Sequence, residues 1–180
     1  MRELVEGFPG LAVIVEPLLI VRRIMRQQLA VLHKMLLDTV RDDPVCRRLM
    51  TAPGVGAVVA LTCRATVDQP QRFVHSRAVG AHVGLTPKRH QSGEIDHDGG
   101  VSKCGDALLR TMLYEAAHSL LIQSKWSWLK AWGVRVAQRR GMRRAIVAVA
   151  RRLAVVLHRM WVDGSEFRWS KDSTAVPAVA

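Results

Sequence analysis

The segment from Arg139 to Trp161 constrains the fold most, because apolar and arginine side chains alternate along it with a helical period. At 100° per residue, one arc holds the large apolar side chains: Met142, Ile146, Val149, Leu153, Val156, Leu157 and Met160. The opposite side carries Arg140, Arg144, Arg151, Arg152 and Arg159. The pattern predicts an amphipathic helix packed on a core, within a mainly helical protein.

The arginines of this segment have no acidic neighbours. Between Ala131 and Met160 there are eight arginines and no Asp or Glu, so ion pairing one turn along the helix is not available. A run of charge is usually a solvated face, but this one favours contact with an external anion, which we interpret as nucleic-acid phosphate. A basic helix lying on a membrane is the lesser alternative.

The whole chain shares this basic bias. Its 180 residues include 27 Lys+Arg and 15 Asp+Glu, a net charge of +12, which indicates a polyanionic partner. The apolar run from Phe8 to Val21 is broken by prolines, a glycine and a glutamate, and it is typical neither of a membrane span nor of a secretion signal. Three widely spaced cysteines without a CxxC pair fit a reducing cytoplasm better than a disulfide framework. We therefore expect nucleic acid rather than a membrane as the partner.

The N-terminal part predicts one long basic helix from about 18 to 41. An apolar stripe recurs at helical spacing in Met25, Leu29, Leu32 and Leu36. Pro17 suits the first turn of this helix, and the sequence Asp42-Asp43-Pro44 ends it. A core or partner-packing helix and half of a coiled coil both remain open. The expected organisation is a coiled-coil-type helix over 1–43, a compact helical domain over 44–170 and a disordered tail over 171–180.

The turn Pro53-Gly54-Val55-Gly56 lies between two apolar stretches and looks like a helix-hairpin-helix DNA-binding element. Two glycines allow a tight turn and a close backbone approach, and the amides of the following helix can face a phosphate oxygen. An ordinary glycine-rich turn between core helices is the alternative, and this short motif alone favours it.

The middle of the chain predicts a helix over 71–83 that Gly84-Leu85-Thr86-Pro87 stops. The polar stretch 88–105 predicts a loop or a short hairpin, of the kind that often carries function. A helix resumes at Asp106, with one apolar face of Leu109, Met112, Leu113, Ala116 and Leu120. The next connection holds Trp126, Trp128 and Trp132, which cap a core more readily than they stack on bases.

Ser92 is the candidate nucleophile of the polar stretch. Basic side chains surround it in sequence: Lys88, Arg89, His90 and Lys103. A serine among cations can attack a phosphodiester, because nearby positive charge stabilises the transition state. Most Ser-Gly pairs in basic loops are turns, however, and Ser102 is a reserve candidate. The acidic cluster from Glu94 to Asp98 lacks the later bidentate Glu of a calcium loop, so we interpret it as a solvated turn and predict no metal site.

Three separated motifs carry a family resemblance. They read LMTAPGVGAVVALTCRATVDQP, then GLTPKRHQSGEIDHDGGVSKCG, then RRGMRRAIVAVARR. In this order, over about 17–169, they resemble the C-terminal domain of transposases of the insertion sequence 110/116/902 family. The resemblance implies an RNA-guided DNA recombinase in which a RuvC-like nuclease domain with four acidic metal ligands precedes a serine-bearing domain, with a helical coiled-coil segment between them.

The resemblance also assigns residues. The serine of the family's Gln-Ser-Gly motif falls on Ser92, which is thereby implied to form a 5′-phosphoserine link to DNA. Lys103, Gly105 and Arg110 match the family's Lys-x-Gly…Leu-Arg run, and Lys103 and Arg110 are expected to hold phosphate.

The remaining expectations concern the whole protein. DNA and a guide RNA are the implied partners, together with a second copy or an intact transposase, at the nucleoid in a bacterial cytoplasm. Magnesium is expected only in the RuvC-like domain, which we expect to be missing, so the chain is expected to be truncated and inactive alone. The alternative function is a non-catalytic nucleic-acid-binding helical module.

Overall fold

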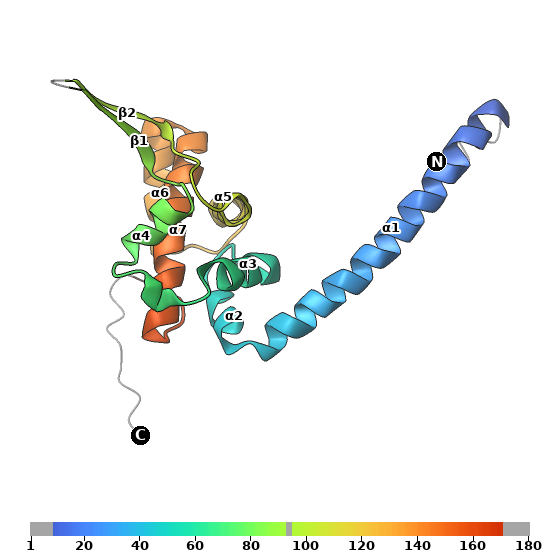
Figure 1. The fold of residues 1–180 in the computed structure, drawn as a ribbon, viewed down its shortest axis with the longest axis horizontal. Helices are drawn as coiled ribbons and strands as arrows, with labels where there is room; N and C mark the ends of the chain where they lie inside the picture. Colours follow the sequence, from blue (N-terminus) through green and yellow to red (C-terminus); the bar gives the residue numbers. More distant parts are fainter. Residues whose placement is uncertain (1–8, 93–94, 171–180) are drawn as a thin grey trace. The chain divides into compact units, whose positions relative to one another are not determined.

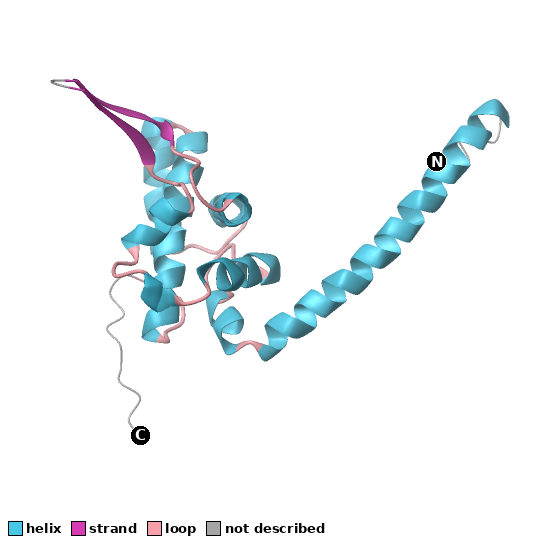
Figure 2. Ribbon diagram, in the orientation of Figure 1, coloured by secondary structure: helices cyan, strands magenta, loops and turns pink. Residues whose placement is uncertain are grey.

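The computed structural model describes residues 9–92 and 95–170, with the backbone alone for residues 9, 12, 89–92 and 95–98. The chain forms two compact units, residues 1–39 and residues 40–180. The described residues are mainly helical, as the sequence predicts, and the polar stretch expected to be a loop or a short hairpin forms a small hairpin. Figure 2 shows how little strand there is beside the helices.

One helix, α1, over Pro9–Asp42, forms the described part of the first unit, and its last residues, from Val40, belong to the second unit. Pro9 starts α1, where the missing N–H of proline costs no hydrogen bond. The prediction that the helix begins near residue 18, with Pro17 in its first turn, is wrong, because Pro17 lies inside the helix. The stripe residues Met25, Leu29 and Leu32 are each more than 60% exposed. The coiled coil stays a prediction.

The second unit is a helical body with one hairpin (Figure 1). Its elements in chain order are α2 (Pro44–Leu49), α3 (Ala57–Val67), the 3-10 turn η1 (Pro70–Arg72), α4 (Arg77–His82), β1 (Pro87–Ser92), β2 (Ile95–Val101), α5 (Ala107–Ile122), α6 (Trp128–Arg140) and α7 (Met142–Asp163). Helix α7 contacts α2, α4, α5, α6 and η1, and is therefore the centre of the core. Its buried side chains include Ile146, Val149, Leu153, Leu157 and Met160, which confirms most of the predicted apolar arc. Met142, in the first turn of α7, is instead exposed.

The predicted start of the helix over 139–161 is also wrong. The sequence places one helix start near Arg139, but Gly141 separates α6 from α7 with a φ of +81°, so Arg140 ends α6. Helix α6 went unpredicted because Leu129 and Gly133 are the buried residues it contributes, which leaves a weak apolar period.

The expected helix over 71–83 is divided into η1 and α4 by a buried histidine of α7. His158 Nε2 donates to the Pro70 carbonyl at 2.9 Å, and its Nδ1 lies 3.0 Å from Ser76 Oγ. Phe73 packs its ring edge-on against the same imidazole. The segment from Pro70 to Ser76 therefore wraps around His158, and these long-range contacts outweigh its local helical pattern.

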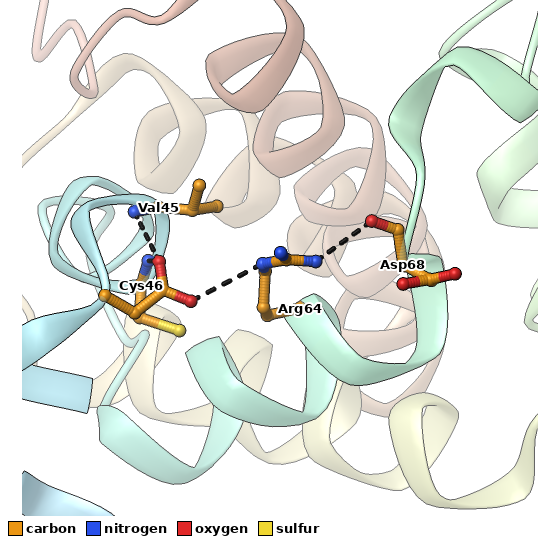
Figure 3. Close-up of polar contacts among 5 residues, drawn as sticks. Val45, Cys46, Arg64 and Asp68 are labelled. Atoms are coloured by element: carbon orange, nitrogen blue, oxygen red, sulfur yellow. Dashed lines mark hydrogen bonds and ion pairs between the residues drawn. The ribbon is translucent and has the colours of Figure 1, made fainter. Parts of the chain in front are cut away.

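Arg64 of α3 joins three elements of the second unit, as Figure 3 shows for its polar contacts. Its Nε lies 3.4 Å from the Asp43 carboxylate, an ion pair without hydrogen-bond geometry, and its Nη1 donates to the Asp68 carbonyl at 2.9 Å. Asp43 caps α2 by accepting from the backbone amides of Val45 and Cys46. The Arg64 guanidinium also lies 4.9 Å from the centre of the Trp161 ring in α7. One side chain thus joins the start of α2 and the end of α3 to the central helix.

The three free cysteines differ in accessibility, which gives a testable reactivity pattern. Cys46 and Cys63 are buried, whereas Cys104 is exposed. Burial raises the pKa of the Cys46 thiol to about 11 and that of Cys63 to about 12, so both stay protonated and unreactive at pH 8 in the folded state. We expect a thiol reagent at pH 8 to modify the exposed Cys104 quickly, and to modify Cys46 and Cys63 only after denaturation. Rapid modification of all three in the native protein would contradict this packing.

Candidate nucleic-acid interface

A groove runs along the hairpin of helices α6 and α7. On α6, Trp128, Trp132, Val136 and Arg140 recur every fourth residue and line one wall. The facing stripe of α7 is Arg144, Val147, Ala148, Arg151, Val155 and Arg159, also spaced by three or four residues. Because residues at these spacings share one side of a helix, each helix presents a continuous strip to the groove.

Segments distant in sequence complete the groove. Arg77 comes from α4, Leu85 and Pro87 from the chain entering β1, and Gly99, Gly100 and Val101 from β2. Pro87 and Val101 are paired at the base of the β1–β2 hairpin, so the hairpin starts at the groove wall. The groove is open to solvent and has a volume of about 1,020 Å³. We call this feature, with the lining residues just named and Arg143 and Arg152, the arginine groove.

The charge of the arginine groove is of one sign. Seven arginines line it: Arg77, Arg140, Arg143, Arg144, Arg151, Arg152 and Arg159. None of its described lining residues is acidic. Guanidinium groups stay charged at any physiological pH and offer paired donors that match phosphate oxygens. The lining of the groove is therefore chemically suited to an anion with several phosphate or carboxylate groups.

Arg152 differs from the other arginines of the groove because aromatic rings hold its guanidinium. The group lies 4.5 Å from the centre of the Trp132 ring and 5.1 Å from that of Trp128. Burial lowers the pKa of Arg152 from its ordinary value. Arg152 therefore fixes the wall between α6 and α7 through cation–π contacts.

Trp128 and Trp132 are half-buried and Trp126 is exposed, so the prediction that all three cap a core is met only in part. Trp128 Nε1 donates to the Arg168 carbonyl at 2.9 Å, and its ring stacks on Phe167, so it fastens the C-terminal segment. Trp126 is 68% exposed and does not line the groove.

The sequence-predicted Lys103 and Arg110 lie together where the hairpin leads into α5. Lys103 has a positive φ of 57°, and its side chain is exposed. Arg110 Nη1 donates to the carbonyls of Lys103 at 3.1 Å and of Val83 at 3.2 Å. Gly105 packs its backbone against the His82 carbonyl, an approach that leaves no room for a side chain. Arg110 thus holds this junction against the end of α4.

The hairpin carries the candidate nucleophile away from the groove. Along β1 the antiparallel register pairs Arg89 with Asp98 and Ser92 with Ile95, and Ser92 is the last residue of the strand. Ser92 is five residues beyond Pro87, a distance of roughly 17 Å along an extended strand. Lys88, near the base, is exposed. The side chains of Arg89, Ser92 and the acidic cluster 94–98 lie outside the described residues.

The two glycines of the predicted helix-hairpin-helix lie in the turn between α2 and α3, not in the arginine groove. Gly54 has a φ of +79°, and its Cα faces the Ala116 carbonyl and Leu120 of α5. Gly56 is the exposed N-cap residue of α3. The close backbone approach predicted for this turn therefore occurs at Gly54, where the chain packs against helix α5.

The sequence pattern identified five of the seven arginines of the groove and missed Arg77 and Arg143. Arg77 reaches the groove by the packing of α4 on α7, and no local pattern signals that contact. Arg143 could have been found, because it is next to Arg144 in the acid-free run.

Two absences characterise the described part of the chain. No three His, Cys, Asp or Glu side chains in it lie close enough to hold a metal ion. None of its helices is long and apolar enough to cross a membrane.

Comparison with known proteins gives consistent matches. Residues 46–133, from α2 into α6, match the family described as "Transposase IS116/IS110/IS902 family". The transposase for insertion sequence element IS1111A of Coxiella burnetii is 38% identical over 114 residues, which is 62% of this chain and 31% of that protein. A putative transposase y4pF/y4sB of Sinorhizobium fredii is 31% identical over 144 residues, 78% of this chain and 37% of that protein.

A probable family 20 transposase of Pseudomonas aeruginosa is 29% identical over 135 residues, 74% of this chain and 40% of that protein. The chain thus spans about a third of the length of the curated relatives it matches. The family match itself ends within α6, before the arginine stripe of α7.

Proposed function

The chain carries a transposase domain of the IS116/IS110/IS902 family, and from this premise we propose that it binds nucleic acid in the arginine groove and presents Ser92 to DNA. The observation that carries the proposal is the gathering of seven arginines, without a described acidic residue, along one groove. An electropositive groove concentrates a polyanion, and each phosphate contact releases a condensed counterion. The function is DNA transposition, with this domain supplying backbone contacts and a nucleophile.

The proposed chemistry at Ser92 is a transesterification. The Ser92 hydroxyl oxygen attacks a DNA phosphorus, the bond from phosphorus to the 3′ oxygen breaks, and a 5′-phosphoserine and a free 3′ hydroxyl result. Cations near the reacting phosphate stabilise the charge that develops in the transition state. The family's Gln-Ser-Gly motif supports this role.

Other parts of the transposition machinery belong to the proposal as partners. A guide RNA, a second transposase copy and a RuvC-like domain with bound magnesium would complete the reaction at the bacterial nucleoid. The described residues form no metal site, and no step proposed for this chain uses one. Lys88, Arg89, Lys103 and the exposed Gly56 at the start of α3 are proposed as secondary phosphate contacts.

A non-catalytic nucleic-acid-binding module is the second candidate function. It is favoured by the arginine groove, which consists of residues of this chain alone and needs no chemistry at Ser92. The two functions differ in one respect, since only the first requires a covalent bond between Ser92 and DNA.

Replacing arginines of the groove with neutral side chains tests whether the groove binds DNA. We expect the triple variant Arg144→Gln, Arg151→Gln, Arg159→Gln to bind a labelled DNA of random sequence more weakly. In a plot of log affinity against log salt, its slope should be shallower by about 2 to 3, because three phosphate contacts are lost. Fluorescence anisotropy over a salt series measures both quantities.

The matched control removes the same charge elsewhere. Arg47, Arg72 and Arg135 are exposed and lie outside the groove, so replacing all three with Gln should leave the slope within about 1 of the native value. Equal losses in the two triple variants would mean that net charge, rather than the groove, binds DNA.

A further inference from the structure

The arginine groove has a hydrocarbon floor as well as a basic rim. Val147, Ala148 and Val155 alternate with arginines along α7, and Val136 lies opposite them on α6. All four are partly exposed rather than buried in the core. Leu85 and Pro87 add apolar surface at the hairpin end. A ligand that fills the groove must therefore offer anionic groups to the arginines and apolar surface to the floor.

A nucleic-acid duplex can contact the arginines of the groove through its phosphates, but it offers no base faces to the apolar floor. Its outer surface is sugar and charged phosphate, while its bases are stacked and paired inside. Pressing phosphates against valine removes water from a charge without providing a hydrogen bond, which is unfavourable. An unpaired strand instead exposes base faces, which gain from contact with apolar or aromatic surface while the phosphates reach the cations.

From this combination we propose that the arginine groove takes an unpaired strand of nucleic acid, with bases on the valine floor and phosphates on the arginine rim. The inference rests on the proposed function and specifies its ligand. From Arg144 to Arg159 the α7 stripe is about 22 Å long at 1.5 Å per residue, the length of roughly six nucleotides stacked at 3.4 Å. A strand segment of this length lies within the range of known single-strand sites.

The test compares an unpaired strand with a duplex. A labelled poly-thymidine oligonucleotide cannot pair with itself, and a hairpin DNA of the same charge supplies the duplex. At one salt concentration we expect the native chain to bind the poly-thymidine strand at least about tenfold more tightly, since each base on the floor adds affinity. Equal affinity, or preference for the hairpin duplex, would overturn the inference and leave the proposed function standing.

A floor variant separates base contact from charge. In Val136→Thr, Val155→Thr each side chain keeps its shape, and both positions are partly exposed, so the fold should persist with an unchanged thermal midpoint. We expect at least threefold weaker binding of the poly-thymidine strand, unchanged binding of the hairpin duplex and an unchanged salt slope. Equal effects on strand and duplex, or none on either, would overturn the inference.

Two further outcomes distinguish a failure of the proposed function from a failure of the inference about an unpaired strand. Failure of the native chain to bind either DNA would contradict the proposed function as well. Tighter binding to phosphatidylglycerol vesicles than to the strand would assign the groove to an anionic lipid surface and overturn the inference.

Discussion

Replacing Ser92 with alanine should abolish covalent capture of DNA by this chain. The reaction to be measured supplies the chain with a RuvC-like nuclease domain of the family, a guide RNA and DNA, and resolves protein–DNA adducts on a denaturing gel. Because a nucleophile cannot be replaced by its neighbours, the yield of adduct should fall at least about 10³-fold. Noncovalent affinity for DNA should stay unchanged, since the arginine groove is not altered.

Ser102 supplies the control for this experiment. It follows β2 and belongs to the same polar stretch, and its amide donates to the Thr86 carbonyl through the backbone, which alanine preserves. Ser102→Ala should therefore give a native yield of adduct. Unchanged capture by Ser92→Ala, with loss in Ser102→Ala, would move the nucleophile to Ser102. Absence of any adduct in the native reaction would favour the non-catalytic binding module.

Replacing Gly54 with alanine should destabilise the second unit strongly. At a φ of +79° an alanine is strained, and its Cβ would meet the Ala116 carbonyl and lie 3.1 Å from Leu120 Cβ. Because the obstacle is α5 backbone, it cannot move aside as a flexible side chain would. We expect the free energy of unfolding to fall by about 3 kcal/mol or more, measured by denaturant titration.

Gly56 in the same turn is the matched control. It has a φ of −97°, and no atom lies within 4 Å of a Cβ added there. Gly56→Ala should therefore cost less than about 1 kcal/mol, the difference between glycine and alanine at an N-cap position. If both variants lost stability equally, the close packing of Gly54 on α5 would not be what the turn requires.

Helices with a strong apolar period, such as α5 and α7, could be predicted from the sequence. Helix α6, whose apolar period is weak, could not. Helices α5 and α7 each bury a regular apolar stripe, so their sequences show the 3.6-residue period clearly. Among the residues of helix α6, Leu129 and Gly133 are the buried ones, so its sequence shows no clear apolar period. The division between η1 and α4 depends on His158, far away in sequence, which no local pattern can show.

The candidate site was also predictable only where a local sequence pattern carries it. The arginines of α7 follow from the period of one helix and the absence of acidic residues around it. Arg77 and the hairpin base enter the groove through tertiary packing, which depends on which helices contact α7. The role of Arg152 was also hidden, because a charge pattern does not show that Trp128 and Trp132 hold its guanidinium.

The most direct test asks where on this chain nucleic acid lies. A thiouridine-containing strand, bound to the native chain and irradiated, can be located by mass spectrometry of the crosslinked peptides. Binding in the arginine groove predicts crosslinks within α6 and α7, between Trp128 and Arg159, and their loss in the triple arginine variant. Crosslinks confined to the basic stretch of α1 around Arg22, Arg23 and Arg26, unchanged in that variant, would contradict it.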